Sequence, residues 1–83
     1  MKVLKFHATW CAPCKMLSKV IEDAGDKLTL PFENIDIDEN MDLAKKYGIR
    51  GVPTMVIVND SGEEIKRQSG VMNENELIDF LKG

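Results

Sequence analysis

The sequence predicts an α/β domain in which a four-stranded mixed sheet is flanked by helices, with the element order β-α-β-α-β-β-α. Two observations predict this class. Apolar residues recur with the period of a strand in some segments and with that of a helix in others. The 83 residues leave room for one hydrophobic core, and no repeat, linker or low-complexity segment divides them. We therefore expect residues 1–83 to form a single layered domain.

The first strand and the first helix flank two cysteines. Residues 2–8 alternate between an apolar face and a more polar face, as a strand does. After the cysteines, apolar residues recur at helical spacing up to residue 24, and Gly25 stands where a helix can end in a left-handed conformation. Pro13 suits the first turn of this helix, where the backbone N–H groups have no acceptor within the helix.

The middle of the chain predicts two strands and a short helix. Residues 28–37 are expected to form a strand, and Pro31 argues for an early or edge position because proline cannot donate to a sheet ladder. A short helix is expected over residues 41–47. Residues 54–58 form a nearly unbroken apolar run, which is typical of a strand buried on both faces. This strand should therefore lie at the centre of the sheet.

The end of the chain predicts a hairpin and a last helix. A turn cluster at residues 59–62 leads to a more polar strand over residues 63–69, and the two strands should pair antiparallel. Asn73 and Glu76 have the spacing of a capping box, so an amphipathic helix should begin there. Four methionines are expected to fill the core: Met16, Met41, Met55 and Met72.

Composition and charge exclude several classes of function. The chain is 43% hydrophobic and 30% charged, and no apolar run approaches the roughly 20 residues of a membrane span. The formal net charge is −3 without a basic block, so neither a membrane nor a nucleic acid is expected as a partner. Lys5 interrupts the apolar start too early for a secretory signal. We expect a cytoplasmic protein, and a monomer because no apolar surface exceeds the needs of the core.

Cys11 and Cys14 are the strongest candidates for a chemical role. Small secreted domains usually carry several disulfides, whereas these two cysteines lie three positions apart and would close too short a loop to stabilise the fold much. Cys11 lies at a helix N-terminus, which favours the thiolate, so it should be the more acidic thiol. A structural bridge is the alternative. Structural zinc needs four ligands, and His7 is the chain's one histidine, so no metal site is expected.

Several segments resemble the thioredoxin family, in the order in which the family has them. They are residues 6–15 (FHATWCAPCK), residues 35–40 (IDIDEN), residues 47–54 (YGIRGVPT), and Gly70 with the final amphipathic helix. A lone C-x-x-C pair is a weak signal, but the preceding Trp10 and a Val-Pro-Thr sequence that opens the central strand make it specific. The resemblance covers essentially the whole chain and implies a thioredoxin fold.

The resemblance implies a thiol–disulfide oxidoreductase that reduces protein disulfides. Cys11 would attack a substrate disulfide, and Cys14 would resolve the mixed disulfide, so that a redox-active Cys11–Cys14 disulfide does the work without a bound cofactor. Disulfide-containing proteins would be the substrates. Because the oxidised protein must be reduced again, the resemblance also implies a partner, a flavoprotein of the thioredoxin-reductase type.

The resemblance also implies a substrate groove. In the family, the proline that matches Pro53 is cis and lies against the dithiol. Val52, Pro53 and Gly70 would form a groove for the substrate backbone, and Trp10 would cover one side of it. An ordinary trans proline at the start of a strand is the alternative at Pro53.

The chain departs from the family in its first elements. The family's usual first strand and first helix have no counterpart before residue 2, so the topology should be nearer to that of a glutaredoxin. Without that strand, residues 28–37 should form an edge of the sheet, where Pro31 and Glu33 are tolerated. No clear glutathione site is visible in the sequence.

Lys5 is the second departure. It stands six residues before Cys11, where thioredoxins usually place a buried aspartate. The sequence predicts a reversed pair beneath the active site, in which Lys5 contacts Asp36 or Glu33 and stabilises thiolates. The alternative is a Lys5 side chain that extends past the end of the sheet to solvent.

Three other functions stay open at the level of the sequence. They are a glutaredoxin-like electron donor, a thiol oxidant or isomerase, and a non-catalytic binding module with the same fold. The reduction potential separates the oxidant from the reductase. Replacement of Cys11 and Cys14 by serine identifies the module, because a binding module would keep its role without thiols.

Overall fold

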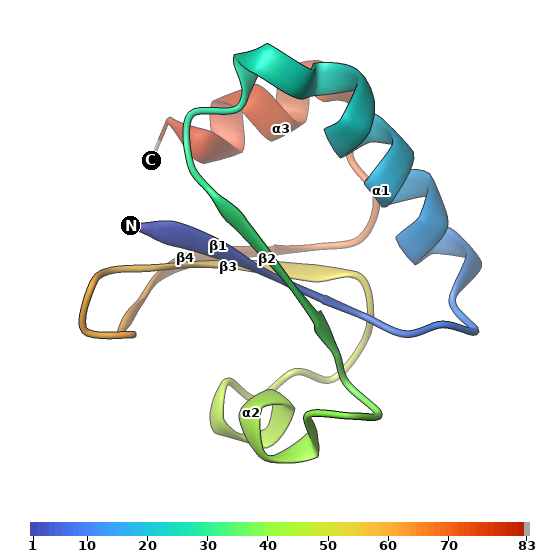
Figure 1. The fold of residues 1–83 in the computed structure, drawn as a ribbon, viewed down its shortest axis with the longest axis vertical. Coiled ribbons are helices and arrows are strands. Elements are labelled where there is room, and N and C mark those ends of the chain that lie inside the picture. Colours follow the sequence, from blue (N-terminus) through green and yellow to red (C-terminus); the bar gives the residue numbers. More distant parts are fainter. Residues whose placement is uncertain (83) are drawn as a thin grey trace.

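A four-stranded sheet forms the middle layer of the molecule, whose residues 1–82 are described by a computed structural model (Figure 1). In chain order the elements are β1 Lys2–His7, α1 Ala12–Ala24, a short 3₁₀ helix η1 Gly25–Lys27, β2 Phe32–Asp36, α2 Met41–Lys46, β3 Thr54–Val58, β4 Glu64–Ser69 and α3 Glu74–Leu81. The strands lie in the order β2-β1-β3-β4, with β1 parallel to β2 and antiparallel to β3, and β4 antiparallel to β3. The predicted fold class and element order are confirmed.

Helices cover both faces of the sheet (Figure 1). α1 and α3 pack on one face, where Leu17, Ile57 and Leu77 share a buried apolar cluster. α2 covers the other face, where its Leu43 packs against a cluster that contains the buried Phe6. β3 lies between the two layers with all of its residues buried, as predicted for a central strand. No helix within residues 1–82 is long and apolar enough to cross a lipid bilayer.

β2 is shorter than predicted and lies at an edge of the sheet, as expected. Of residues 28–37, only Phe32–Asp36 form the strand. Pro31 precedes it, and the Pro31 carbonyl oxygen accepts the backbone N–H of Val3 at 2.9 Å. Leu28 and Leu30 pack against the core cluster under α1 and α3 without belonging to the strand. Their apolar character therefore reflects packing and not strand pairing. The other strands and α2 end within one residue of their predicted bounds.

Two of the four methionines assigned to the core are exposed instead. Met55 and Met72 are buried, whereas Met16 is 60% exposed and Met41 is 72% exposed. The side of α1 that faces the sheet is formed by residues such as Leu17, which leaves the neighbouring Met16 on the outer side. The prediction from residue type alone was wrong at these two positions.

The ends of α1 and α3 follow their sequence signals. Cys11 is the N-cap of α1, and its side chain accepts the backbone N–H of Cys14. Gly25 ends α1 with a φ of 47°, a conformation that glycine adopts without steric cost. α3 begins with the predicted capping box of Asn73 and Glu76. The N-terminus of α1 therefore lies directly after β1, with the two cysteines at its first turn.

Candidate active site

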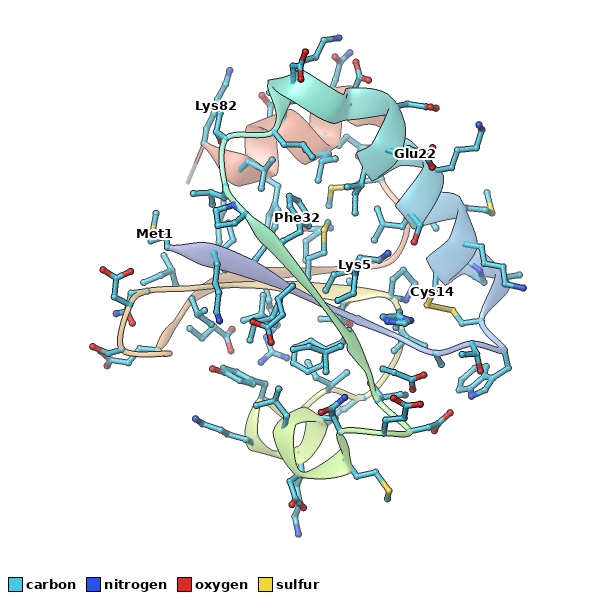
Figure 2. All side chains as sticks on the ribbon, viewed as in Figure 1. Met1, Lys5, Cys14, Glu22, Phe32 and Lys82 are labelled. Carbon is cyan, nitrogen blue, oxygen red and sulfur yellow. A yellow bond between two sulfur atoms is a disulfide. The ribbon has the colours of Figure 1, made fainter. Side chains whose placement is uncertain are left out.

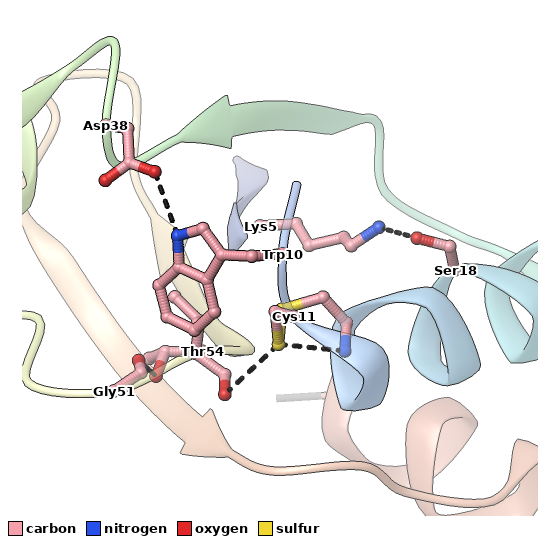
Figure 3. Close-up of a disulfide and its surroundings, with 9 residues drawn as sticks. Lys5, Trp10, Cys11, Ser18, Asp38, Gly51 and Thr54 are labelled. Atoms are coloured by element: carbon pink, nitrogen blue, oxygen red, sulfur yellow. Dashed lines mark hydrogen bonds between the residues drawn. A yellow bond between two sulfur atoms is a disulfide. The ribbon is translucent and has the colours of Figure 1, made fainter. Parts of the chain in front are cut away.

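The two cysteines form a disulfide at the N-terminus of α1 (Figure 3). Their Cα atoms are 5.3 Å apart, within the usual range for a disulfide. Cys11 is 4% exposed and Cys14 is 3% exposed, and both pack against Ala8. The bridge therefore lies in a small apolar cluster at one end of the sheet.

Cys11 has the surroundings of a stabilised thiolate. Its Sγ accepts the backbone N–H of Cys14 at 3.2 Å. N–H groups without a helical acceptor, together with the helix dipole, favour negative charge at a helix N-terminus. When the disulfide is reduced, the same N–H contact is available to a Cys11 thiolate, and a thiolate is the nucleophile in thiol–disulfide exchange.

A loop that ends in a cis proline lies against the disulfide. The Val52–Pro53 peptide bond is cis, as the resemblance implied. Cys11 Sγ lies 3.7 Å from the carbonyl oxygen of Val52. Gly70 has a φ of 89°, and its backbone N–H donates to the Pro53 carbonyl oxygen at 2.9 Å. The fold thus brings Val52, Pro53 and Gly70 together beside Cys11.

The same loop is held from the start of β3. The Thr54 hydroxyl donates to the carbonyl oxygen of Gly51 at 2.8 Å and lies 3.1 Å from the hydroxyl of Ser69 on β4. Thr54 is buried, so this pair of contacts lies inside the sheet. The contacts fix the backbone on both sides of Pro53, which keeps the loop at the disulfide.

Trp10 lies beside the disulfide and is 69% exposed. Its indole Nε1 donates to the carboxylate of Asp38 at 3.0 Å (Figure 3). Asp38 was not predicted as a site residue from the sequence. A signal was present, because β1 and β2 are parallel neighbours and their carboxyl ends meet at the same edge of the sheet. Trp10 follows β1 and Asp38 follows β2, so the two residues are brought together.

Lys5 is buried between the sheet and α1, with 5% of its surface exposed. Its Nζ donates a hydrogen bond to the hydroxyl of Ser18 on α1 (Figure 3). Burial lowers the pKa of the Lys5 amine below its usual 10.5, because the charged form loses its hydration. The alternative of a Lys5 that extends into solvent is therefore wrong.

The predicted ion pair of Lys5 with Asp36 or Glu33 is also wrong. Glu33 pairs with Lys2 at 2.7 Å, because strand alternation places Glu33 on the opposite face of the sheet from Lys5. Asp36 lies on the same face as Lys5 but two residue pairs further along the strand, and its carboxylate accepts the backbone N–H of Asp38 at 2.9 Å. No ion pair within residues 1–82 involves Lys5.

Metal-ligating side chains are not gathered at this site. Within the described part of the chain, no three His, Cys, Asp or Glu side chains are grouped as they would be to hold a metal ion. His7 is half-buried at the end of β1, opposite Asp36 of β2. The redox group of the site is the disulfide itself.

An exchangeable cysteine pair at a helix N-terminus transfers two electrons each time it passes between disulfide and dithiol. In this chain the pair lies beside the cis-proline loop, with Cys11 Sγ 3.7 Å from the Val52 carbonyl oxygen. The fold and the site therefore define a thiol–disulfide oxidoreductase.

Comparison with known proteins identifies the family. The family model described as Thioredoxin matches residues 1–83. The chain is 36% identical to thioredoxin from Mycoplasmoides gallisepticum over 81 residues, which is 96% of this chain and 80% of that protein. It is 34% identical over 82 residues to the SPbeta prophage-derived thioredoxin-like protein YosR of Bacillus subtilis, covering 99% of this chain and 96% of that protein. The chain belongs to the thioredoxin family.

The solved structures agree with this assignment. A thioredoxin variant from Halobacterium salinarum superimposes with a TM-score of 0.85 at 40% identity, covering 96% of this chain and 70% of that chain. A thioredoxin from Nicotiana alata superimposes with a TM-score of 0.83 at 37% identity, covering 96% and 69%. The chain has the thioredoxin fold and is a protein disulfide reductase whose active group is the Cys11–Cys14 pair.

Proposed function

We propose that this protein reduces disulfides of other proteins in the cytoplasm, as a monomer of one domain, by a two-step exchange at Cys11 and Cys14. The Cys11 thiolate attacks a substrate disulfide, forms a mixed disulfide and releases the first substrate thiol. Cys14 loses its proton and attacks Cys11, which releases the second substrate thiol and forms the Cys11–Cys14 disulfide. Two electrons pass from the dithiol to the substrate. The observation that carries the proposal is the disulfide at the N-terminus of α1.

The neighbouring loop supports a protein substrate. Val52, Pro53 and Gly70 lie together beside Cys11, and Val52 and Gly70 are only half-buried. An exposed aromatic side chain provides apolar contact area at low entropic cost. Trp10 has this character, since its hydrogen bond to Asp38 fixes the ring while most of it stays exposed. We assign these four residues to substrate binding.

The cycle needs a source of electrons. No cofactor is required at the site, because the disulfide is itself the redox group. We infer that a flavoprotein of the thioredoxin-reductase type recycles the protein, and that neither a membrane nor a nucleic acid takes part. Recharging by that reductase but not by glutathione would separate this function from that of a glutaredoxin-like donor.

A redox titration tests the proposed direction of electron flow. The protein is equilibrated in dithiothreitol and glutathione buffers, and the two thiols are counted by alkylation and mass spectrometry. We expect a midpoint within or below the cytosolic range of about −220 to −320 mV. A midpoint at about −180 mV or higher would make the protein an oxidant or isomerase. The variant with Cys11→Ser and Cys14→Ser is the control, and it should show no transition.

A further inference from the structure

A lysine without a carboxylate partner lies inside this molecule. Lys5 points from β1 into the layer between the sheet and α1 (Figure 2). Its pairing partners in the sheet are Asn34 on β2 and Met55 on β3, neither of which carries a charge. The one hydrogen-bond acceptor of its Nζ within residues 1–82 is the Ser18 hydroxyl. An ammonium group carries three N–H donors, so a single neutral acceptor satisfies it poorly.

This amine lies next to the dithiol site. Ser18 follows Cys14 by four residues on α1, so its side chain lies one helical turn along the same face. In the sheet, Lys5 is followed by Phe6, which pairs with Thr54 on β3. Thr54 is the residue directly after Pro53, whose loop lies beside the disulfide. Figure 3 shows Lys5 reaching from β1 to Ser18 alongside the disulfide. Any charge on the amine therefore acts on the sulfur atoms through a partly buried layer, where electrostatic interactions are stronger than in bulk water.

Few other charged groups face this amine. β1 contributes His7 and β2 contributes Asp36, which strand alternation places on the face of Lys5, while β3 contributes only the uncharged Met55. α1 contributes Cys14, which can titrate only when the disulfide is reduced. The charged residues of α1 are all exposed on its outer side: Lys15, Lys19, Glu22 and Asp23. The Asp36 carboxylate is turned to the backbone of Asp38. The group whose charge changes most during the redox cycle is therefore the dithiol itself.

We propose that Lys5 takes up a proton when the Cys11–Cys14 disulfide is reduced and releases it when the disulfide forms again. The proposal rests on the redox cycle proposed above. In the disulfide form, the ammonium has no opposite charge to offset its burial. In the dithiol form, the Cys11 thiolate provides that charge. By linkage, the ammonium stabilises the thiolate as much as the thiolate stabilises the ammonium.

The proposed step balances in electrons and protons. Two electrons from the reductase break the S–S bond, one sulfur becomes the Cys11 thiolate, and the other takes a proton as the Cys14 thiol. At a pH between the Lys5 midpoints of the two redox forms, the Lys5 amine takes one further proton from solvent and becomes an ammonium. When a substrate disulfide oxidises the pair again, two electrons and the Cys14 proton pass to the substrate thiols, and the ammonium returns its proton to solvent. Lys5 is a positioning residue in this scheme, because it touches neither substrate nor the sulfur atoms.

Two measurements on the whole protein test the proposal. NMR of the Lys5 side-chain Nζ and Cε follows its titration in the disulfide form and in the dithiol form. We expect the midpoint to lie about one pH unit or more higher in the dithiol form. Proton uptake on reduction is measured in lightly buffered solution. At pH values between the two Lys5 midpoints, the wild type should take up one proton more per disulfide than Lys5→Met.

A matched control separates the effect of the buried Lys5 charge from the effect of removing any one positive charge. Lys19→Met removes the same charge from the exposed side of α1, and its proton uptake should equal that of the wild type. Alkylation of Cys11 at neutral pH should become about threefold to tenfold slower in Lys5→Met but not in Lys19→Met, because the thiolate loses its nearby cation.

Two results would overturn the proposal. One is an identical Lys5 midpoint in both redox forms, which needs no variant and so does not depend on how Lys5→Met folds. The other is an extra proton that titrates on His7 while Lys5 is unchanged. Failure of the dithiol to cycle in dithiothreitol would instead remove the proposed function, so the two failures are distinguishable.

Discussion

At the scale of single residues, the two sulfur atoms of the site differ in their neighbours. Cys11 Sγ accepts a backbone N–H at the start of α1, which supports the proposed attack by Cys11, and it lies beside the Val52 carbonyl. We expect Cys14→Ser to attack a disulfide-bonded test protein such as insulin and to stop there, because no second thiol resolves the mixed disulfide. Non-reducing electrophoresis and mass spectrometry detect the covalent adduct.

The matched control is Cys11→Ser, which removes the attacking thiol and keeps the buried one. It should give no adduct above background under the same conditions. Equal yields of adduct from both variants would contradict the assignment, since either sulfur would then serve as the nucleophile.

Lys5 also affects the stability of the disulfide form. Burial lowers the pKa of Lys5 below the 10.5 of an exposed lysine, so the unfolded chain binds more protons between the two values and stability rises with pH across that window. Each unit of pKa depression corresponds to about 1.4 kcal/mol. At neutral pH we expect Lys5→Met to raise the free energy of unfolding, because the variant no longer bears the cost of burying this amine. Urea denaturation at several pH values measures this gain, which should shrink as the pH approaches 10.5.

Lys19→Met is again the control for the loss of one positive charge. Lys19 is exposed, so its removal should change the free energy of unfolding by less than about 0.5 kcal/mol at any of these pH values. A gain for Lys5→Met that stays constant with pH would show that better packing, and not relief of a buried charge, stabilises the variant.

At the scale of elements, the start of α3 depends on one side chain. The Asn73 carboxamide oxygen accepts the backbone N–H of Glu76 at 2.8 Å, and the Glu76 carboxylate accepts the backbone N–H of Asn73 at 2.9 Å. Asn73→Ala leaves the helix N–H group without this acceptor and should cost about 1 kcal/mol. The urea midpoint measures the loss. Asn75→Ala, within the same helix and exposed, is the control and should cause no loss.

The elements themselves could be predicted because their signals are local. The apolar run of β3, the cap of α3 and Gly25 at the end of α1 each specify an element without reference to distant residues. β2 was predicted too long because Leu28 and Leu30 are apolar for a tertiary reason, their packing under α1 and α3. Periodicity within one segment does not distinguish these two causes of apolar character.

The contacts of the site are less predictable than its residues. The C-x-x-C pair and the Val-Pro-Thr sequence identify Cys11, Cys14 and Pro53 by themselves. The hydrogen-bond partner of Lys5 depends on which element covers the face of the sheet from which Lys5 projects. That element is α1, so the hydroxyl of Ser18, and not a carboxylate of β2, accepts the hydrogen bond of the Lys5 amine. The strand alternation identified the correct face but not the partner across the layer.

At the scale of the whole molecule, the position of the disulfide predicts how reduction affects the fold. Cys11 and Cys14 belong to a small buried cluster that joins the larger cluster under α2 only through the half-buried Ile37 and Val52. The bridge spans a sequence separation of 3, so loss of the loop constraint should cost no more than about 2 kcal/mol on a chain-entropy estimate. Stabilisation of the Cys11 thiolate at the N-terminus of α1 offsets part of that cost.

We therefore expect the dithiol form to stay folded, with a far-UV circular dichroism spectrum like that of the disulfide form and a somewhat lower urea midpoint. The double variant with Cys11→Ser and Cys14→Ser removes both the bridge and the thiolate, so it should be no more stable than the dithiol form. If reduction unfolds the chain, the bridge holds the structure together and is not a redox group, because a reductase must keep its substrate surface in both states. A folded dithiol form leaves Trp10 and the Pro53 loop in place for the next substrate.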